Sequence, residues 1–280
     1  MDLYQLIEYS MNEDIKTGDI TTDLLITPNK ITTATITSKG DGVFFGESII
    51  KQFAKMYTDL TFKINCNDGD LIYDQTVCVE ISGPYHLILK IERTLLNFLQ
   101  RLSGIATTTA NYVAALNDAS IQVLDTRKTT PLLRDLEKAA VVAGGGHNHR
   151  HGLYDMLLIK ENHLNHYLNS NQMVDFQLLL TQQKNKFPSI QIELEIASFN
   201  ELAMIDFTPI DIILFDNMTF SELDRCIKFC NTNAPHCLKE VSGNIRLDNI
   251  AKYRSVDIDR ISVGALTHSV TALDLSLLVS

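Results

Sequence analysis

The sequence predicts an α/β protein with two domains, and three features of the 280-residue chain lead to this fold class. Before about residue 120, β-rich runs are separated by turns, with few helices between them, as in an α+β unit. After that point, β-rich runs and helical segments alternate regularly. Polar or small residues follow almost every one of these later runs. Because such alternation is typical of parallel strands joined by crossover helices, we expect a parallel β/α domain in the second part.

Apolar spacing defines the elements of the first domain. Residues at helical spacing predict short helices over Leu3–Tyr9 and Gly46–Tyr57. β-branched and aromatic residues predict strands, at Ile31–Ser38, Leu60–Ile64, Thr76–Ile81 and Tyr85–Leu89. A long helix, broken near Gly104, is expected over Ile91–Asn117. We place domain 1–118, which contains this connecting helix, before domain 119–280, and expect the extreme C-terminus to pack back on the first domain.

Six β-rich runs form the predicted parallel sheet of the second domain. They lie at Ile121–Leu124, Asp155–Ile159, Ile190–Ile196, Asp211–Phe215, Leu238–Val241 and Arg260–Val263. Helices are expected between them, over Leu132–Ala143, Val174–Lys186, Asn200–Ile205, Phe220–Cys230 and Leu247–Tyr253. This pattern alone allows either a barrel or an open doubly wound sheet.

Composition limits the class of protein. Apolar residues make up 45% and charged residues 21%, as in ordinary soluble globular proteins. A net charge of −10 argues against a nucleic-acid or membrane-surface binder, because either would carry a basic face. No apolar run approaches the roughly 20 residues that span a bilayer. Five cysteines without CxxC pairs indicate a reduced, cytoplasmic protein.

Basic side chains gather after the first two predicted strands of the second domain. Arg127 and Lys128 follow the first strand, and Lys160 ends the second, with Arg150 and His149 between them. Since ligands of parallel α/β sheets bind at the carboxyl ends of the strands, these groups predict a site for a ligand with several carboxylates or phosphates. An alternative is a zinc site formed by the alternating imidazoles His147, His149 and His151, which Arg150 would disfavour by repulsion.

Acidic residues stand at the ends of the next two strands. Glu195 and Asp216 are predicted to accept hydrogen bonds from a ribose and to help to place a Mg²⁺ ion that carries pyrophosphate. A carboxylate at this position would also stabilise positive charge that develops on a sugar ring. Glu193, in contrast, is expected to face solvent and to pair with lysines.

Small residues follow the last two strands. They are Ser242, Gly243 and Asn244, and then Val263, Gly264 and Ala265. Free backbone N–H groups in such turns receive phosphate in many β/α barrels, so the pair of turns predicts a phosphate site. Their presence favours a barrel over an open sheet.

Two strings in the second domain carry a resemblance to a known family. Asp125-Thr126-Arg127-Lys128-Thr129-Thr130-Pro131 is the first, and the second runs from Gly144-Gly145-Gly146-His147-Asn148-His149-Arg150 to Lys160-Glu161-Asn162-His163. With these strings the chain resembles the quinolinate phosphoribosyltransferases, also called nicotinate-nucleotide pyrophosphorylases (carboxylating). The similarity extends over most of the chain, from Glu13-Asp14 to Thr267-His268.

The resemblance implies an N-terminal α/β sandwich and a C-terminal, incompletely closed β/α barrel. It implies a homodimer, or a higher oligomer built from it, in which Arg93 enters the neighbouring active site. Quinolinate and phosphate contacts would come from Arg127, Lys128, His149, Arg150 and Lys160, and the ribose and Mg²⁺ contacts from Glu195 and Asp216. Contacts to the 5′-phosphate and its surroundings would come from Ser242, Gly243, Asn244, Val263, Gly264, Ala265 and His268.

The implied reaction transfers phosphoribosyl from phosphoribosyl pyrophosphate to the ring nitrogen of quinolinate, with loss of CO₂, in the biosynthesis of NAD. Of these residues, Lys128, Lys160, Glu195 and Asp216 are the expected catalytic groups. Two alternatives are a relative with another acceptor, such as the ModD-like proteins linked to molybdenum transport, and a non-catalytic anion-binding protein of the same fold. The intact strings argue against the first, and the presence of the acidic residues and Lys160 argues against the second.

Three positions depart from the family pattern. Leu132 and Asn244 stand where the family usually has glycine, and His151 is an additional imidazole. We expect Leu132 to stiffen its loop and Asn244 to loosen the phosphate turn.

Overall fold

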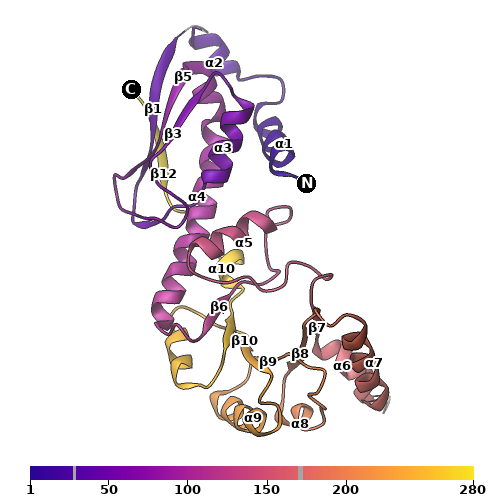
Figure 1. Cartoon of the computed structure of the whole chain (residues 1–280). Coiled ribbons are helices and arrows are strands. Elements are labelled where there is room, and N and C mark those ends of the chain that lie inside the picture. The colour runs from indigo at the N-terminus through magenta and orange to yellow at the C-terminus, as the bar shows by residue number, and fades with distance from the viewer. Residues whose placement is uncertain (28–29, 170–172) are drawn as a thin grey trace. The chain divides into compact units, whose positions relative to one another are not determined.

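The computed structural model describes residues 1–27, 30–169 and 173–280 (Figure 1). The chain divides into two compact units. The first comprises Met1–Ala110, Thr129–Gly145 and Leu266–Ser280, and the second comprises Asn111–Lys128 and Gly146–Ala265. Each unit is therefore formed from segments that are distant in the sequence.

A four-stranded antiparallel sheet forms the centre of the first unit. Its order is β12 (Leu275–Val279), β1 (Ile31–Ser38), β5 (Val77–Pro84) and β3 (Thr61–Ile64). The C-terminal strand β12 pairs with β1, with Ile36 opposite Leu277, so the end of the chain completes a sheet that the N-terminal region begins. The short strands β2 (Gly42–Val43) and β4 (Leu71–Ile72) form a separate two-stranded sheet.

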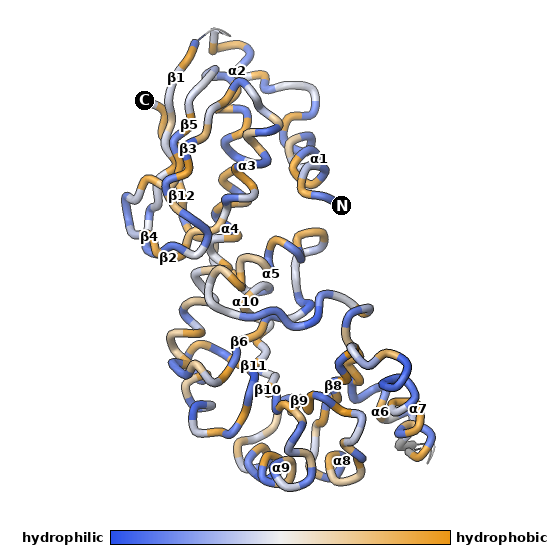
Figure 2. Tube along the Cα trace, viewed as in Figure 1, coloured by the Kyte–Doolittle hydropathy of each residue, from blue (hydrophilic) through white to orange (hydrophobic). Residues whose placement is uncertain are grey.

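Helices of the first unit pack on this sheet and on one another. They are α1 (Leu3–Ile15), α2 (Ile20–Leu25), α3 (Glu47–Met56), most of α4 (Tyr85–Leu116), α5 (Arg134–Ala143) and most of α10 (Ala265–His268). Helix α3 contacts β3, and α1 contacts α3 (Figure 1). Ile49, Ile50 and Phe53 of α3 are fully buried, each worth about 1.5–3 kcal/mol of hydrophobic stabilisation. Polar residues alternate with them along the helix (Figure 2), so its amphipathic pattern explains its position.

The prediction of a helix over Ile91–Asn117 with a break near Gly104 was wrong about where the helix begins and about the break. Tyr85–Leu89 was predicted as a strand, but α4 runs without a break from Tyr85 to Leu116. Ile88, Ile91 and Leu95 are fully buried at helical spacing, which explains why this apolar run joins the helix. Gly104 does not break the helix. A Cβ there would lie 2.4 Å from the carbonyl oxygen of Thr271, so glycine permits the C-terminal segment to cross α4 closely.

The glycine run after α5 has a similar packing role at its first position. A Cβ on Gly144 would lie 2.3 Å from the carbonyl oxygen of Ala106 in α4. Gly145 adopts a φ of +85° with open space around its Cα, so it requires glycine for its backbone conformation instead. These two glycines thus satisfy constraints within the first unit.

An ion pair between the half-buried Arg101 and the buried Glu137 joins four segments of the first unit. The carboxylate of Glu137 in α5 is fully buried and accepts hydrogen bonds from Arg101 of α4, at 2.9 Å from Nε and 2.6 Å from a terminal nitrogen. The backbone N–H of Thr130 donates to the other carboxylate oxygen at 3.1 Å. Arg101 also donates to the hydroxyl of Thr130 and to the carbonyl oxygen of Thr267. Since both charges are paired and bonded, the network fixes the loop before α5 and the segment that contains α10.

A six-stranded parallel sheet forms the second unit. Its order is β6 (Gln122–Leu124), β11 (Arg260–Ser262), β10 (Leu238–Ser242), β9 (Ile212–Asp216), β8 (Ile192–Ile196) and β7 (Leu157–Ile159). The first strand in sequence pairs with the last, as in a barrel, and no ladder joins β6 to β7 within the described ranges. The predicted incompletely closed β/α barrel is therefore confirmed. His147 forms a single parallel bridge with Leu124 and lies along β6.

The remaining helices belong to the crossover connections of this unit. They are α6 (Glu161–Asn169), α7 (Met173–Lys186), α8 (Phe199–Leu202), α9 (Phe220–Asn233) and the 3₁₀ helix η1 (Ile250–Ser255). All six predicted strands are present. Helix α6 was not predicted, and the helix expected over Leu247–Tyr253 is the 3₁₀ turn η1, displaced by a few residues.

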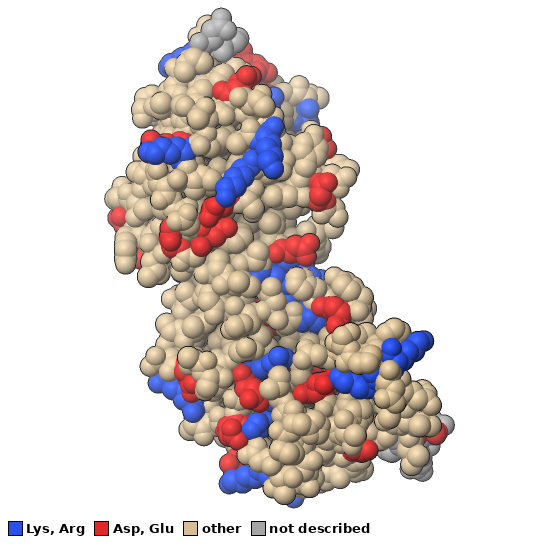
Figure 3. Space-filling view, viewed as in Figure 1, with Lys and Arg blue, Asp and Glu red and all other residues tan. Residues whose placement is uncertain are grey.

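On the face drawn in Figure 3, acidic and basic groups are interspersed among neutral ones. Among the helices that the structure describes, none has both the length and the apolar character needed to cross a membrane.

Leu132 gives a testable consequence of the backbone. It adopts a φ of +68° and its side chain is 75% exposed, so it has left-handed strain and little packing to offset it. Replacing Leu132 by Gly should raise the free energy of unfolding by about 0.5–1 kcal/mol, because relief of strain exceeds the added entropy of the unfolded chain. Urea denaturation measures the change. Leu132→Ala keeps the strain and should leave stability unchanged, so equal gains from both variants would contradict this explanation.

Candidate active site

Polar residues gather at the carboxyl ends of the strands of the second unit. Arg127 and Lys128 follow β6, and Lys160 follows β7. Glu195 lies in β8, and Asp216 and Ser242 are the last residues of β9 and β10. Val263 and Gly264 follow β11, and Ala265 begins α10. The parallel pairing brings these ends to one rim, which is where sites of β/α barrels form.

Two guanidinium groups lie near each other at this rim. Arg150 is 8% exposed, and burial together with the positive charge of Arg127 lowers its pKa from the ordinary value. The Nε atom of Arg127 is buried and has no hydrogen-bond partner within the described residues. A buried donor and two repelling cations are unfavourable unless an anion joins them, so this pair is suited to hold a carboxylate or a phosphate.

Lys160 extends the positive charge toward β8. Its Nζ lies 2.9 Å from Oε2 of Glu195, whose side chain is only 14% exposed. The backbone N–H of Lys160 donates to Nδ1 of His163 at 3.0 Å, which ties the end of β7 to the first turn of α6. The ammonium is half-exposed and therefore can also contact a ligand.

The turns that follow β9 and β10 are joined to each other by hydrogen bonds. Ser242 donates through its hydroxyl to Oδ1 of Asp216 at 2.5 Å, and the Asn217 amide donates to Oδ2 at 2.7 Å. Gly243 has a φ of +92°, and a Cβ there would lie 2.3 Å from Oδ1 of Asn217. Asn244 also adopts a left-handed φ, +51°, and its amide donates to Oδ1 of Asn217 at 2.9 Å. Asn tolerates this conformation, so the expected loosening of the turn by Asn244 was wrong: the side chain cross-links it.

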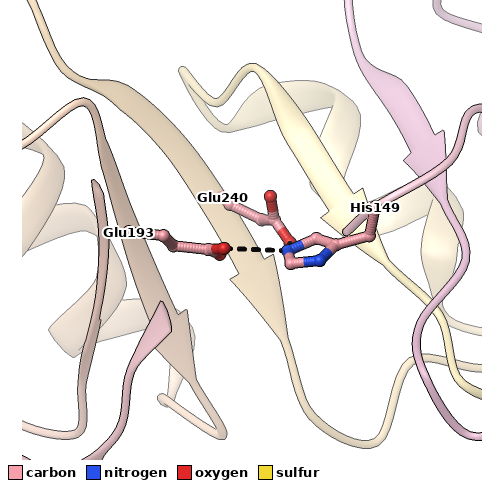
Figure 4. Close-up of side chains that lie close together, drawn as sticks. All are labelled: His149, Glu193 and Glu240. Carbon is pink, nitrogen blue, oxygen red and sulfur yellow. Dashed lines mark ion pairs between the residues drawn. The ribbon is translucent and has the colours of Figure 1, made fainter. Parts of the chain in front are cut away.

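His149 enters the interior of the sheet, between two buried carboxylates. Its Nε2 lies 2.9 Å from Oε2 of Glu193 and 3.4 Å from Oε1 of Glu240 (Figure 4). Both glutamates are fully buried. Burial and the charge of Glu193 raise the pKa of Glu240 to about 7. The backbone N–H of His149 donates to the buried Asp125 at 2.9 Å, which fixes the segment that carries the ring.

The sequence reasoning therefore missed two members of the site. Glu193 was expected to face solvent, but it is 0% exposed, and Glu240 was not considered. The period of two along a strand contained the signal: Glu193 shares a face with Glu195, and Glu240 shares a face with Ser242. A residue two positions before a rim residue lies on the same face of the sheet, and in this unit that face lines the interior of the barrel.

The alternative of a three-histidine zinc site is not what the fold assembles. In the described parts of the chain, a single group of three potential metal ligands lies within 4.8 Å, namely His149, Glu193 and Glu240. His147 lies along β6, and the backbone N–H of His151 donates to Asp155 at 2.7 Å.

Arg93 and His268 belong to the first unit, unlike the other predicted site residues. Arg93 is exposed on α4 and lines a cavity of about 510 Å³ together with Glu13, Asp14 and Arg101. His268 ends α10, with Nδ1 at 2.7 Å from the hydroxyl of Ser269.

Known proteins match the chain over its whole length. The quinolinate phosphoribosyl transferase N-terminal domain matches residues 19–103, and the C-terminal domain of that family matches residues 105–278. The chain belongs to the quinolinate phosphoribosyl transferase family.

Individual members of the family are similar at moderate identity. A probable nicotinate-nucleotide pyrophosphorylase (carboxylating) of Bacillus subtilis is 37% identical, with 99% of this chain and 93% of the relative covered. A quinolinate phosphoribosyltransferase (decarboxylating) of Nicotiana tabacum is 34% identical, with 99% of this chain and 82% of the relative covered. The crystal structure of NadC from Streptococcus pyogenes superposes with a TM-score of 0.89 at 33% identity, over 99% of this chain and 95% of the other.

The turn after β10 offers a test of the site's construction in this family member. Gly243→Ala should lower the free energy of unfolding by about 2–3 kcal/mol, because the new methyl group meets Asn217 and the backbone keeps its left-handed φ. Gly145→Ala is the matched control: φ is similar, but no atom lies within 4 Å of the added Cβ. It should cost only the conformational part, about 1 kcal/mol. Equal losses in urea denaturation would show that the contact with Asn217 contributes nothing.

Proposed function

We propose that this chain transfers the phosphoribosyl group of phosphoribosyl pyrophosphate to the ring nitrogen of quinolinate and releases CO₂, giving nicotinate mononucleotide and pyrophosphate. The observation that carries the proposal is the pair Arg127 and Arg150, whose positive charges repel each other; among the described residues, the buried Nε of Arg127 has no hydrogen-bond partner, so the pair is suited to bind an anion. Lys160 lies at the next strand end, beside Glu195. A dicarboxylate would add negative charge beside Arg127 and Arg150, in addition to the carboxylates of Glu193, Asp155 and Glu195 that already act on Arg150.

The basic groups would bind and orient both substrates. Arg127, Arg150 and His149 would hold the carboxylates of quinolinate, while Lys128 and Lys160 face the anions of the phosphoribosyl donor. The C1–oxygen bond breaks and pyrophosphate leaves with the electron pair, while the ring nitrogen forms its bond to C1. The nitrogen is then cationic, so the electrons of the adjacent carbon–carboxylate bond can pass into the ring as CO₂ leaves. A proton from water completes the product. Positioning and electrostatics carry most of the rate in such a reaction.

Glu195 and Asp216 would serve the ribose and a Mg²⁺ ion. Carboxylate oxygens are suitable ligands, and Mg²⁺ commonly uses one or two carboxylates with water and substrate phosphates. Asp216 is held by Ser242 and Asn217, and Glu195 is held by Lys160, so both carboxylates are fixed at the rim. When bound, the ion would neutralise charge on the pyrophosphate. Ser242 to Asn244, Val263 to Ala265 and His268 remain the predicted surroundings of the 5′-phosphate.

A discontinuous assay tests the reaction. The full-length protein is incubated with phosphoribosyl pyrophosphate, Mg²⁺ and either quinolinate or nicotinate, and nicotinate mononucleotide is separated by chromatography. We expect product from quinolinate alone, with equimolar CO₂. Product from nicotinate alone, or no product with either from folded protein, would reject the proposed substrate and leave the family and fold unaffected.

The arginine pair provides a residue-level prediction. Arg127→Ala and Arg150→Ala should each lower kcat/KM for quinolinate by about 100-fold or more, because each removes charge-assisted bonds from the substrate. Arg225→Ala is a suitable control, since that guanidinium stacks on Phe199 instead, at 3.6 Å from the ring centroid. Near-normal kcat/KM in both site variants would overturn the assignment of the pair.

We also propose a homodimer in which Arg93 completes the neighbouring site. Its support is the exposure of Arg93 beside a cavity whose other charged members are Glu13, Asp14 and Arg101. The higher oligomer and the cytoplasmic location stay predictions.

Complementation tests the shared site. Arg93→Ala and Lys160→Ala homodimers should each be almost inactive. In a mixed dimer, one site would keep its own Lys160 and receive an intact Arg93, so random mixing should restore about a quarter of wild-type activity. Mixing each variant with itself is the control. No recovery, with mixed dimers demonstrated by differential tags, would exclude the contribution of Arg93 across the interface.

A further inference from the structure

The segments that carry Arg127 and Arg150 run side by side at the edge of the parallel sheet. His147 forms a bridge with Leu124 of β6, and its backbone N–H donates to the carbonyl oxygen of Val123 at 2.8 Å. Three residues beyond the bridge, the same register would place Arg150 opposite Arg127. Like charges at opposite positions of neighbouring strands are destabilising, so a regular continuation of this pairing is unfavourable.

Asp125 ends the regular pairing before it reaches the arginines. Its backbone N–H donates to the carbonyl oxygen of His147 at 3.1 Å, which is the second bond of the bridge. The next bond of a parallel ladder would join the N–H of His149 to the carbonyl oxygen of Asp125. The N–H of His149 donates instead to Oδ1 of Asp125, at 2.9 Å. A side-chain oxygen thus takes the place of the main-chain oxygen, and the two segments stay joined where the ladder ends.

Beyond this point each segment turns through side-chain bonds of its own. The hydroxyl of Thr126 accepts a hydrogen bond from the backbone N–H of Lys128 at 3.0 Å, which bends the chain around Arg127. After Arg150, the carboxylate of Asp155 accepts from the N–H groups of the next two residues, at 2.7 and 2.9 Å. These bonds are local to each segment, whereas the bond between Asp125 and His149 joins one segment to the other.

The burial of Asp125 indicates that its carboxylate serves this contact. Its side chain is 0% exposed, and a charge at such a position is costly unless its oxygens accept hydrogen bonds. An N–H bond to a carboxylate is shorter and stronger than one to a carbonyl oxygen. The bond lies two residues before Arg127 and one residue before Arg150. It therefore fixes the two segments close to the positions that carry the repelling charges.

We propose that Asp125 is a positioning residue that holds the segment of Arg150 against that of Arg127, through the backbone N–H of His149, so that both guanidinium groups can bind one dicarboxylate. The identity of this ligand as quinolinate rests on the proposed function. The placement of the two segments rests on their hydrogen bonds. A competing explanation is that Asp125 contributes only its negative charge, and an amide in its place distinguishes the two.

The first test follows the backbone amide proton of His149 and requires no activity. In full-length protein labelled with ¹⁵N-histidine, its signal is assigned by its absence from His149→Gln. The proton should exchange slowly with solvent, although it lies beyond the last main-chain bond of the bridge. Asp125→Ala should speed the exchange about tenfold or more, whereas Asp125→Asn keeps an oxygen at Oδ1 and should leave it slow. Fast exchange in the wild-type protein, or equal rates in all three proteins, would overturn the proposal.

The second test measures the two substrates separately. Asp125→Ala should raise the KM for quinolinate about tenfold or more, because both arginines remain but are no longer held together. The kcat and the KM for phosphoribosyl pyrophosphate should change much less. Asp125→Asn should recover most of the lost affinity, and a loss in Asp125→Asn as large as that in Asp125→Ala would favour the charge alone and reject the positioning role.

Asp259→Ala is the matched control for the kinetic test. The carboxylate of Asp259 also accepts a bond from a backbone N–H of a neighbouring strand, that of Lys239 at 2.7 Å, but at the amino ends of β10 and β11, away from the rim. Its loss should lower stability and leave both KM values unchanged. If Asp125→Ala likewise lowers only stability or kcat, its role is merely structural and the proposal fails.

A double-mutant cycle identifies the group through which Asp125 acts. In an Arg150→Ala background, Asp125→Ala should lower kcat/KM for quinolinate by less than about threefold, far below its effect in the wild-type protein, because the group that it positions is already absent. Losses that multiply independently would overturn the assignment. If quinolinate is not a substrate at all, amide exchange at His149 still decides whether Asp125 holds the segment, so the two hypotheses fail separately.

Discussion

Alternation of side chains along parallel strands is the constraint on which the site of the second unit depends. In β8, Ile192, Leu194 and Ile196 are buried on one face while Glu193 and Glu195 occupy the other. Parallel pairing of β8, β9 and β10 then places the inward residues of neighbouring strands in the same interior. The last inward residue of each strand reaches the rim and can meet a ligand. The preceding inward residue is buried, so the same rule that forms the rim forms the acidic layer below it.

This layer has an energetic cost that hydrophobic packing elsewhere must offset. Burial, and then repulsion by the neighbouring Glu193, raise the pKa of Glu240 to about 7. At the rim, Arg127 and Arg150 repel each other as well, and a buried donor remains unsatisfied among the described residues. Such arrangements are unfavourable for stability and favourable for binding anions, because an incoming ligand supplies the missing charge. The site thus combines repulsion between two guanidinium groups with the imidazole of His149, whose Nε2 lies 2.9 Å from the buried Glu193.

The first unit provides fixed points for the chain where it passes from one unit to the other. Two of the four passages occur between Lys128 and Thr129 and between Ala265 and Leu266. Thr130 and Thr267, which follow these passages closely, are both bonded to the ion pair of Arg101 and Glu137. Arg127, Lys128 and His268 are near these points in sequence. An ion pair with a fully buried carboxylate is sensitive to loss of its cation, so this pair fixes the two segments without adding much net stability.

By itself the sequence determined the element types of the second unit, its parallel sheet and the membership of most rim positions, because strand periodicity and the residues after each strand are local signals. It also carried the family resemblance that chose a barrel over an open sheet. Only the tertiary structure decided that Tyr85–Leu89 joins α4, that Gly104 and Gly144 serve close backbone packing, and that Asn244 cross-links its turn. It alone placed Glu193 and Glu240 around His149, because burial of a charge depends on partners from distant strands that no local pattern contains.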